Sequence, residues 1–154
     1  MGNRRGRKEP FVPIDIVLIE DDDGDARAVI RALSKAKVAN PVVRYYDGEE
    51  ALENLRGGDP DLPQHYIILL DLNMPRMTGH EFLKEIREDP HLSDAIIFVM
   101  TTSRDEEDIE MAWSRNIAGY VLKSNVGEDF VNLIRTLDNY WHIVEKPTMF
   151  RRPG

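Results

Sequence analysis

Five short apolar runs, each followed by a stretch of helical period, constrain the fold of this chain more than any other feature. The runs are rich in Ile and Val and lie at residues 14–19, 42–46, 66–70, 96–100 and 120–122. Strands that alternate strictly with helices predict a parallel sheet with helices on both faces. The near-continuous apolar character of the runs agrees, because the strands of a parallel sheet are buried on both sides.

Apolar residues that recur on one helical face follow each run. The five stripes are Val29, Ala32, Leu33 and Ala36; Ala51, Leu52 and Leu55; Phe82, Leu83 and Ile86; Ile109, Ala112 and Trp113; and Phe130, Ile134, Leu137, Trp141 and Val144. The last stripe is the longest and keeps one face over about four turns. Three helix starts carry a capping-box pattern, and these are Asp47 with Glu50, Thr78 with Glu81, and Ser103 with Glu106.

Chemically capable residue types stand directly after four of the five strands. Glu20 and Asp21 follow the first run, and Asp71 follows the third. Thr101 follows the fourth run and Lys123 the fifth. Each residue alone can be a helix cap, a turn residue or a solvated side chain. Because ligands bind beyond the carboxyl ends of the strands in such a sheet, their joint position predicts a site at that edge.

Carboxylates crowded at this edge would repel one another, so the sequence predicts a neutralising cation. Mg²⁺ is the natural candidate, since it takes oxygen ligands from carboxylates, waters and phosphates. Zinc is not indicated, because there is no cysteine and the histidines lack close ligand spacing; they are His65, His80, His91 and His142. With a cation present, Asp71 can act as a nucleophile toward phosphorus. Lys123 and the Thr101 hydroxyl would then stabilise the phosphoryl oxygens, whereas Asp25 can be explained as a helix cap alone.

Composition limits the classes of function open to the chain. The 154 residues carry a net charge of −8. Such a body is a poor general binder of nucleic acid, because duplex affinity comes largely from cations that meet phosphates. The absence of cysteine fits a reducing cytoplasm, where we expect the protein to act. The apolar runs are too short to cross a bilayer, and the amino terminus lacks the features of a secretory signal.

The two ends of the chain differ from the acidic body between them. Residues 1–13 form a basic tail, and residues 146–154 form a second one. We expect one domain over residues 14–145, with no DNA-binding domain and no membrane segment. The tails fit disordered, solubilising ends. Contacts with an acidic partner, RNA or lipid are the alternative.

Four motifs in order resemble the receiver domains of two-component response regulators, over residues 14–145. They are IVLIEDDDGDA, IILLDLNMPRMTG, IIFVMTTS and AGYVLKS. Within the second motif, Pro75 and Gly79 match the turn that follows the family's phosphoacceptor. A finer resemblance is to the stand-alone receivers that partner bacterial phytochrome histidine kinases. It is carried by MTTSRDEEDI and by the long final segment ending LDNYWHIVE.

The resemblance implies a flavodoxin-like (CheY-like) fold of five βα units and a signalling switch that is not an enzyme. It implies these ligands of Mg²⁺: Asp21 and Asp71 directly, Glu20 through water, and Asn73 through its backbone carbonyl. Asp71 would accept a phosphoryl group from a histidine on a sensor kinase. Thr101 would then swing toward the phosphate, and Tyr120 would rotate inward.

A switch without an effector domain must signal through a protein contact. The long last helix carries more apolar residues than one sheet face can cover. We therefore expect a homodimer that uses this helix and the terminal segments, with Tyr140 and Trp141 contributing.

Two residues depart from the family pattern, and two alternative functions remain open. Ser124 stands where most receivers have proline after the lysine, and Thr102 stands where many have Ala or Gly. One alternative is a phosphohydrolase that uses an aspartyl phosphate, but Asn73 occupies the position of the second acid and cannot donate as a general acid. The other is a degenerate receiver that only binds, which the full set of site residues disfavours.

Overall fold

The computed structural model describes residues 15–35, 41–58, 60, 62, 66–125, 132, 135 and 136. Its strands are β1 (Asp15–Ile19), β2 (Val42–Tyr45), β3 (Tyr66–Leu70), β4 (Ile97–Thr101) and β5 (Gly119–Leu122). Its helices are α1 (Asp23–Lys35), α2 (Gly48–Glu53), α3 (Gly79–Glu88) and α4 (Glu106–Ser114). A π-helical turn, Asn54–Gly58, extends α2, and a 3₁₀ turn, Lys123–Asn125, follows β5.

All five strands pair in parallel in the order β2-β1-β3-β4-β5. The flavodoxin-like fold expected from the sequence is therefore confirmed. The register of β1 with β3 brings two acidic residues together, because Ile19 at the end of β1 lies opposite Leu70 at the end of β3. The residues that follow these two, Glu20 and Asp71, leave neighbouring strands side by side. From β1, the connection to β2 leads to one edge of the sheet, and β3, β4 and β5 follow toward the other edge. The strand order therefore reverses between β1 and β3, and this pair of acids stands at that topological switch point, where such sheets bind ligands.

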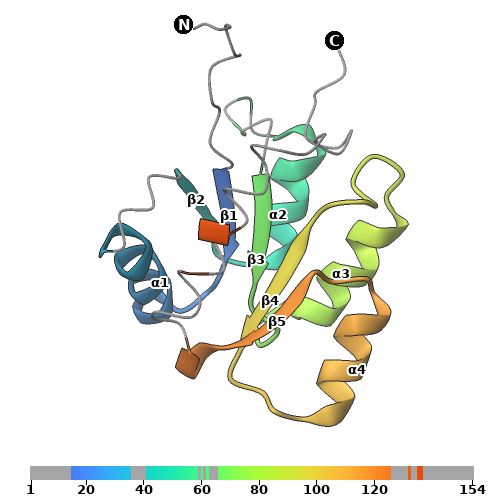
Figure 1. The fold of residues 1–154 in the computed structure, drawn as a ribbon. Coiled ribbons are helices and arrows are strands. Elements are labelled where there is room, and N and C mark those ends of the chain that lie inside the picture. The colour runs from blue at the N-terminus through green and yellow to red at the C-terminus, as the bar shows by residue number, and fades with distance from the viewer. Residues whose placement is uncertain are drawn as a thin grey trace, which may run out of the picture.

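Helices cover both faces of the sheet (Figure 1). On one face, Ala26, Val29 and Leu33 of α1 join the cluster of buried residues that includes Ile16 and Leu18. On the other face, apolar residues of α2, α3 and α4 pack on alternate residues of the same strands. Continuous apolar strands thus serve both layers, as their composition predicts.

Trp113 is where the predicted stripe of α4 is wrong. The helical period predicts that it lies on the buried face with Ile109 and Ala112. Ala112 is buried and Ile109 is half-buried, but 48% of Trp113 is exposed. The reason is that α4 covers only the margin of the sheet, so a single residue on this short helix faces the core.

Two of the three predicted helix starts are confirmed. Thr78 and Glu81 form a complete capping box at α3, and the Asp47 side chain accepts a bond from the Glu50 amide at α2. The third is wrong, because Asp105 and not Ser103 caps α4. Ser103 lies in the loop before the helix, where its hydroxyl donates to the Asp108 carboxylate instead.

The predicted last helix lies almost wholly outside the described residues. Asn132, Arg135 and Thr136 are helical and exposed, as expected for residues off its apolar stripe. Tyr140, Trp141 and the terminal segments fall outside, so the homodimer stays a prediction. Among the described residues, no helix has the length and hydropathy needed to span a membrane.

Candidate functional site

Three acidic side chains converge where β1 and β3 end. One carboxylate oxygen from each of Glu20, Asp21 and Asp71 lies within 4.8 Å of the other two. Glu20 and Asp71 are buried, with 0% and 2% exposed, whereas Asp21 faces solvent. The positions of these residues at the strand ends predict this convergence, and the register of β1 with β3 explains it.

Lys123 reaches the same cluster from the end of β5. Its Nζ lies 2.8 Å from Glu20 Oε1, 2.6 Å from Asp25 Oδ2 and 3.4 Å from Asp71 Oδ2. Burial opposes the charge on this amine, but the bonds to Asp25 and Glu20 outweigh burial and raise its pKa. Among the described residues there is no cis peptide bond, so the Lys123–Ser124 bond is trans and the lysine reaches the site without one.

The two buried carboxyls resist ionisation. Burial raises the pKa of Glu20 to about 7, the charge of Asp71 adds to the rise, and Lys123 opposes it. Burial also raises the pKa of Asp71, against the lowering effects of Lys123 and of the Asn73 amide. One lysine therefore does not neutralise this group of acids.

A divalent cation fits this pocket. Carboxylate oxygens are the ligands that Mg²⁺ and Mn²⁺ prefer, and the raised pKa values indicate an unmet need for positive charge. Glu20, Asp21 and Asp71 are placed to hold such an ion between one exposed and two buried acids. Asn73 lies two residues after Asp71 in the same loop, and its backbone amide donates to Asp71 Oδ1 at 3.2 Å. The metal-binding role of its backbone carbonyl stays a prediction.

The loop after Asp71 folds tightly back on the strand end. The Gly79 amide donates to the Leu72 carbonyl at 2.9 Å. A Cβ on Gly79 would lie 2.6 Å from the Asp71 carbonyl oxygen and 2.5 Å from Leu72 Cα, both backbone atoms that cannot move aside. Glycine is thus required here, as the turn motif indicated.

Arg44 on β2 holds the loop that carries the acids, a role that was not predicted from the sequence. Its Nε and Nη2 donate to the Glu20 carbonyl at 3.0 and 2.9 Å. Its Nη1 lies 2.8 Å from Asp23 Oδ1, and the Tyr46 ring lies 4.1 Å from the guanidinium. The signal for it was a lone cation within an apolar strand. Asp25, explained from sequence as a cap, is likewise a partner of Lys123.

Thr101 and Tyr120 are linked by the loop between β4 and α4. Thr101 is fully buried, and its Oγ1 accepts bonds from Asn73 Nδ2 and the Ser103 amide, both at 3.3 Å. The Tyr120 hydroxyl donates to the Ser103 carbonyl at 2.9 Å, and its ring packs against the core. The predicted movement of these residues stays a prediction. Thr102, which lies between Thr101 and Ser103 in the sequence, is exposed.

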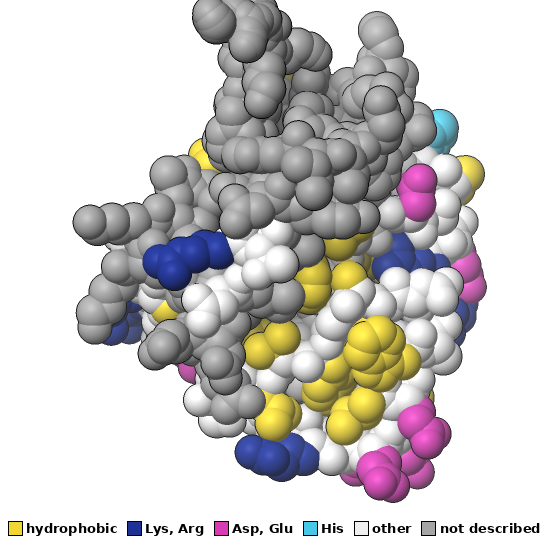
Figure 2. Space-filling model, in the orientation of Figure 1, with side chains coloured by type: hydrophobic (Ala, Val, Ile, Leu, Met, Phe, Trp, Pro, Cys, Tyr) yellow, Lys and Arg dark blue, Asp and Glu magenta, His cyan; other side chains and the backbone are white. Residues whose placement is uncertain are grey.

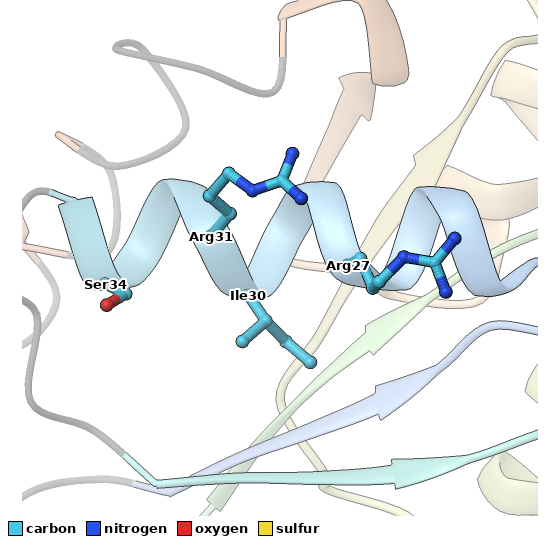
Figure 3. A pocket seen from close by; sticks show the side chains of 4 residues that line it. All are labelled: Arg27, Ile30, Arg31 and Ser34. Atoms are coloured by element: carbon cyan, nitrogen blue, oxygen red, sulfur yellow. The ribbon is translucent and has the colours of Figure 1, made fainter.

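Two other surface features lie apart from the acids. A cavity of about 440 Å³ runs along α1, lined by Arg27, Ile30, Arg31 and Ser34 (Figure 3). It holds no carboxylate among these residues, so it is not the cation site. Hydrophobic side chains also gather over β5 and the adjoining part of α4 (Figure 2). Among the residues of α4, Met111 and Trp113 are about half exposed.

The fold and the site together define a class of protein: an α/β domain that can hold a divalent cation and a phosphoryl group at its topological switch point. The sequence model of the response regulator receiver domain matches residues 16–135. The chain belongs to the response regulator receiver family.

Three relatives illustrate the match. The probable methanogenesis regulatory protein FilR2 of Methanothrix harundinacea is 31% identical over 137 residues, covering 87% of this chain and 85% of that protein. Response regulator Rcp1 of Synechocystis is 30% identical over 131 residues, covering 84% and 89%. The crystal structure of Mn²⁺-bound Rcp1 superposes with a TM-score of 0.71 over 88% of this chain and 99% of Rcp1. The crystal structure of the phosphorylated cyanobacterial phytochrome response regulator RcpA is 31% identical in sequence. It superposes with a TM-score of 0.70 over 88% of this chain and 98% of RcpA.

Proposed function

We propose that this protein is a response regulator that accepts a phosphoryl group on Asp71 from a histidine of a sensor kinase. The observation that carries the proposal is the burial of Asp71 beside Glu20, Asp21 and Lys123 at the switch point of the sheet. Relatives described as phytochrome response regulators support a kinase of the phytochrome type as the donor. We place the protein in the cytoplasm with that kinase.

The residues of the chain divide the transfer between them. An oxygen of Asp71 forms a bond to phosphorus while the bond from phosphorus to the histidine nitrogen breaks, and the pair of electrons stays on the histidine ring. Lys123 and the Thr101 hydroxyl donate to phosphoryl oxygens, whose charge grows during transfer. Mg²⁺, when bound by Glu20, Asp21 and Asp71 with the Asn73 carbonyl, supplies charge that offsets carboxylate and phosphate repulsion.

The output is a change in protein contacts. Phosphorylation adds charge beside Thr101, which is joined through Ser103 to Tyr120. A local change of charge at a bistable loop shifts the population between two packings. We propose self-association as a homodimer as one use of the switch.

A phosphohydrolase is disfavoured by the contacts of Asn73. Its side-chain nitrogen Nδ2 donates to Thr101 Oγ1, and an amide N–H is too weak an acid to protonate a leaving group.

The test is labelling by acetyl phosphate in the presence of Mg²⁺. The wild type should gain one phosphoryl group that acid or hydroxylamine removes, as expected for an acyl phosphate. Asp71→Asn should abolish the gain, as measured by intact mass, whereas Asp94→Asn, which alters an exposed acid, should leave it unchanged. Labelling that persists in Asp71→Asn would overturn the assignment.

A further inference from the structure

Ser103 is the branch point of a hydrogen-bonded chain that leads away from the candidate site. Its amide donates to Thr101 Oγ1 at 3.3 Å, and its carbonyl accepts from the Tyr120 hydroxyl at 2.9 Å. Its own hydroxyl donates to Asp108 Oδ2 at 2.6 Å. One residue thus joins the two switch side chains to α4.

Asp108 is held from two sides. Its second oxygen, Oδ1, lies 3.1 Å from Nε2 of His80, at the start of α3. Bonds from Ser103 and then His80 lower the pKa of Asp108, so the carboxylate stays charged. The His80 side chain is 20% exposed, and its buried Nδ1 has no hydrogen-bond partner among the described residues, so the bond from Nε2 to Asp108 is the polar contact that orients the ring. Through Asp108, the loop between β4 and α4 is thereby tied to the start of α3.

This chain of bonds supplies one of the two hydrogen bonds that the Thr101 hydroxyl accepts. A hydroxyl can accept two hydrogen bonds and donate one. Thr101 Oγ1 accepts from Asn73 Nδ2 and from the Ser103 amide. Its proton takes part in neither bond and is left to be donated in the remaining direction, as contact with a phosphoryl oxygen requires.

We propose that His80 and Asp108 are positioning residues for phosphoryl transfer, acting through Ser103 to hold Thr101 and Tyr120 ready before the phosphate arrives. We call His80, Asp108 and Ser103 the α3–α4 latch. A loop that is ordered in advance loses less conformational entropy when it contacts the phosphate. This inference rests on the proposed function, because it concerns the transfer to Asp71.

The first test measures the rate of Asp71 phosphorylation by acetyl phosphate at saturating Mg²⁺. Ser103→Ala and His80→Ala should each lower the rate about fivefold, the factor expected for one net hydrogen bond. Ser103→Thr keeps the hydroxyl, and His80→Gln keeps a donor, so both should return the rate to within about twofold of wild type. The double alanine variant should resemble either single variant, because residues that act through one chain are not additive.

The second test uses a readout that a purely structural role would not move. The protein is labelled with fluorotyrosine, and the Tyr120 signal is assigned in the ¹⁹F spectrum with Tyr120→Phe. Ser103→Ala should shift or broaden the Tyr120 signal without phosphoryl donor, and leave the signal of Tyr45, buried on β2, unchanged. Urea unfolding confirms that each variant is folded.

Two outcomes separate the inference from the function beneath it. If wild type is labelled on Asp71 but the alanine variants keep its rate and its Tyr120 signal, the latch is wrong and the proposed function stands. If the wild type is not labelled on Asp71, the proposed function is wrong, and the inference about the α3–α4 latch is wrong with it.

Discussion

Lys123 is held most closely by a residue that takes no part in binding a phosphoryl group. Its Nζ is 2.6 Å from Asp25 and 3.4 Å from Asp71. A lysine that must contact a phosphoryl oxygen on Asp71 has to weaken the bond to Asp25. Asp25 therefore competes with the phosphoryl group for the same amine.

Replacing Asp25 should speed phosphorylation. In Asp25→Asn the lysine loses the nearest of its three charged partners, while a polar side chain of similar shape remains. Because 46% of the Asp25 side chain is exposed, the pair contributes at most about 1 kcal/mol. We expect the rate of labelling by acetyl phosphate to rise up to about fivefold.

Asp23→Asn is the matched control for charge. It removes the same charge from the same turn, but Asp23 pairs with Arg44 and not with Lys123. An equal rise in both variants would mean that reduced repulsion of acetyl phosphate, and not release of the lysine, sets the rate.

At the scale of elements, the side chain of Arg87 joins α3 to two loops. Its guanidinium donates to the carbonyls of Ser93 and Ala95 before β4, at 2.8 and 2.7 Å. It also donates to the carbonyls of Arg115 and Asn116 after α4, at 2.7 and 2.9 Å. These carbonyls belong to turns without a regular ladder, so one charged fork satisfies backbone groups that lack strand or helix partners.

Arg87→Met should therefore destabilise the fold. The methionine fills the aliphatic part of the site but leaves four acceptors without their donor. We expect the free energy of unfolding, measured with urea, to fall by about 2–3 kcal/mol. Lys84→Met on the same helix removes only an exposed i,i+4 pair with Glu88, and should cost less than about 0.5 kcal/mol. Similar losses in the two variants would contradict the role given to Arg87.

At the scale of the whole molecule, an acidic chain of net charge −8 buries two carboxyls side by side. The pKa of Glu20 is about 7 in the folded protein against an ordinary value of 4.5. Between these pH values the folded state holds a proton that the unfolded chain has lost. Stability from this carboxyl is thus present at low pH and is lost as pH rises through 7.

Without metal, the protein should melt at a lower temperature at pH 8 than at pH 6, by a few degrees. Mg²⁺ should raise the melting temperature more at pH 8, because it binds the ionised carboxylates of the folded state. Thermal unfolding followed by circular dichroism measures both effects. Glu20→Gln should reduce the dependence on pH, and Asp21→Ala should reduce the effect of Mg²⁺. If Mg²⁺ does not change the melting temperature at either pH, the proposal that this pocket binds the cation is wrong.

The sequence by itself determined where the five strands lie, the burial of the three central ones on both faces, and the residues at their ends. Apolar runs and helical stripes record which backbone segments are buried, and this information is local. Asp71 could be placed because it follows a buried run without a gap, and Glu20 because it does the same one strand away. Once the sheet was parallel, these ends had to meet at one edge.

Only the tertiary structure decided which polar side chains touch one another. Lys123 and Asp25 are 98 residues apart, and Arg44 reaches the Glu20 carbonyl 24 residues away. Ser103 matched a cap by spacing, yet Asp105 caps α4, and Trp113 matched a stripe, yet it is exposed because α4 covers only the sheet margin. The partner of a long polar side chain depends on the register of the strands, the direction of the side chain and the donors that compete for the same acceptor. None of these can be deduced from the residues next to it in the sequence.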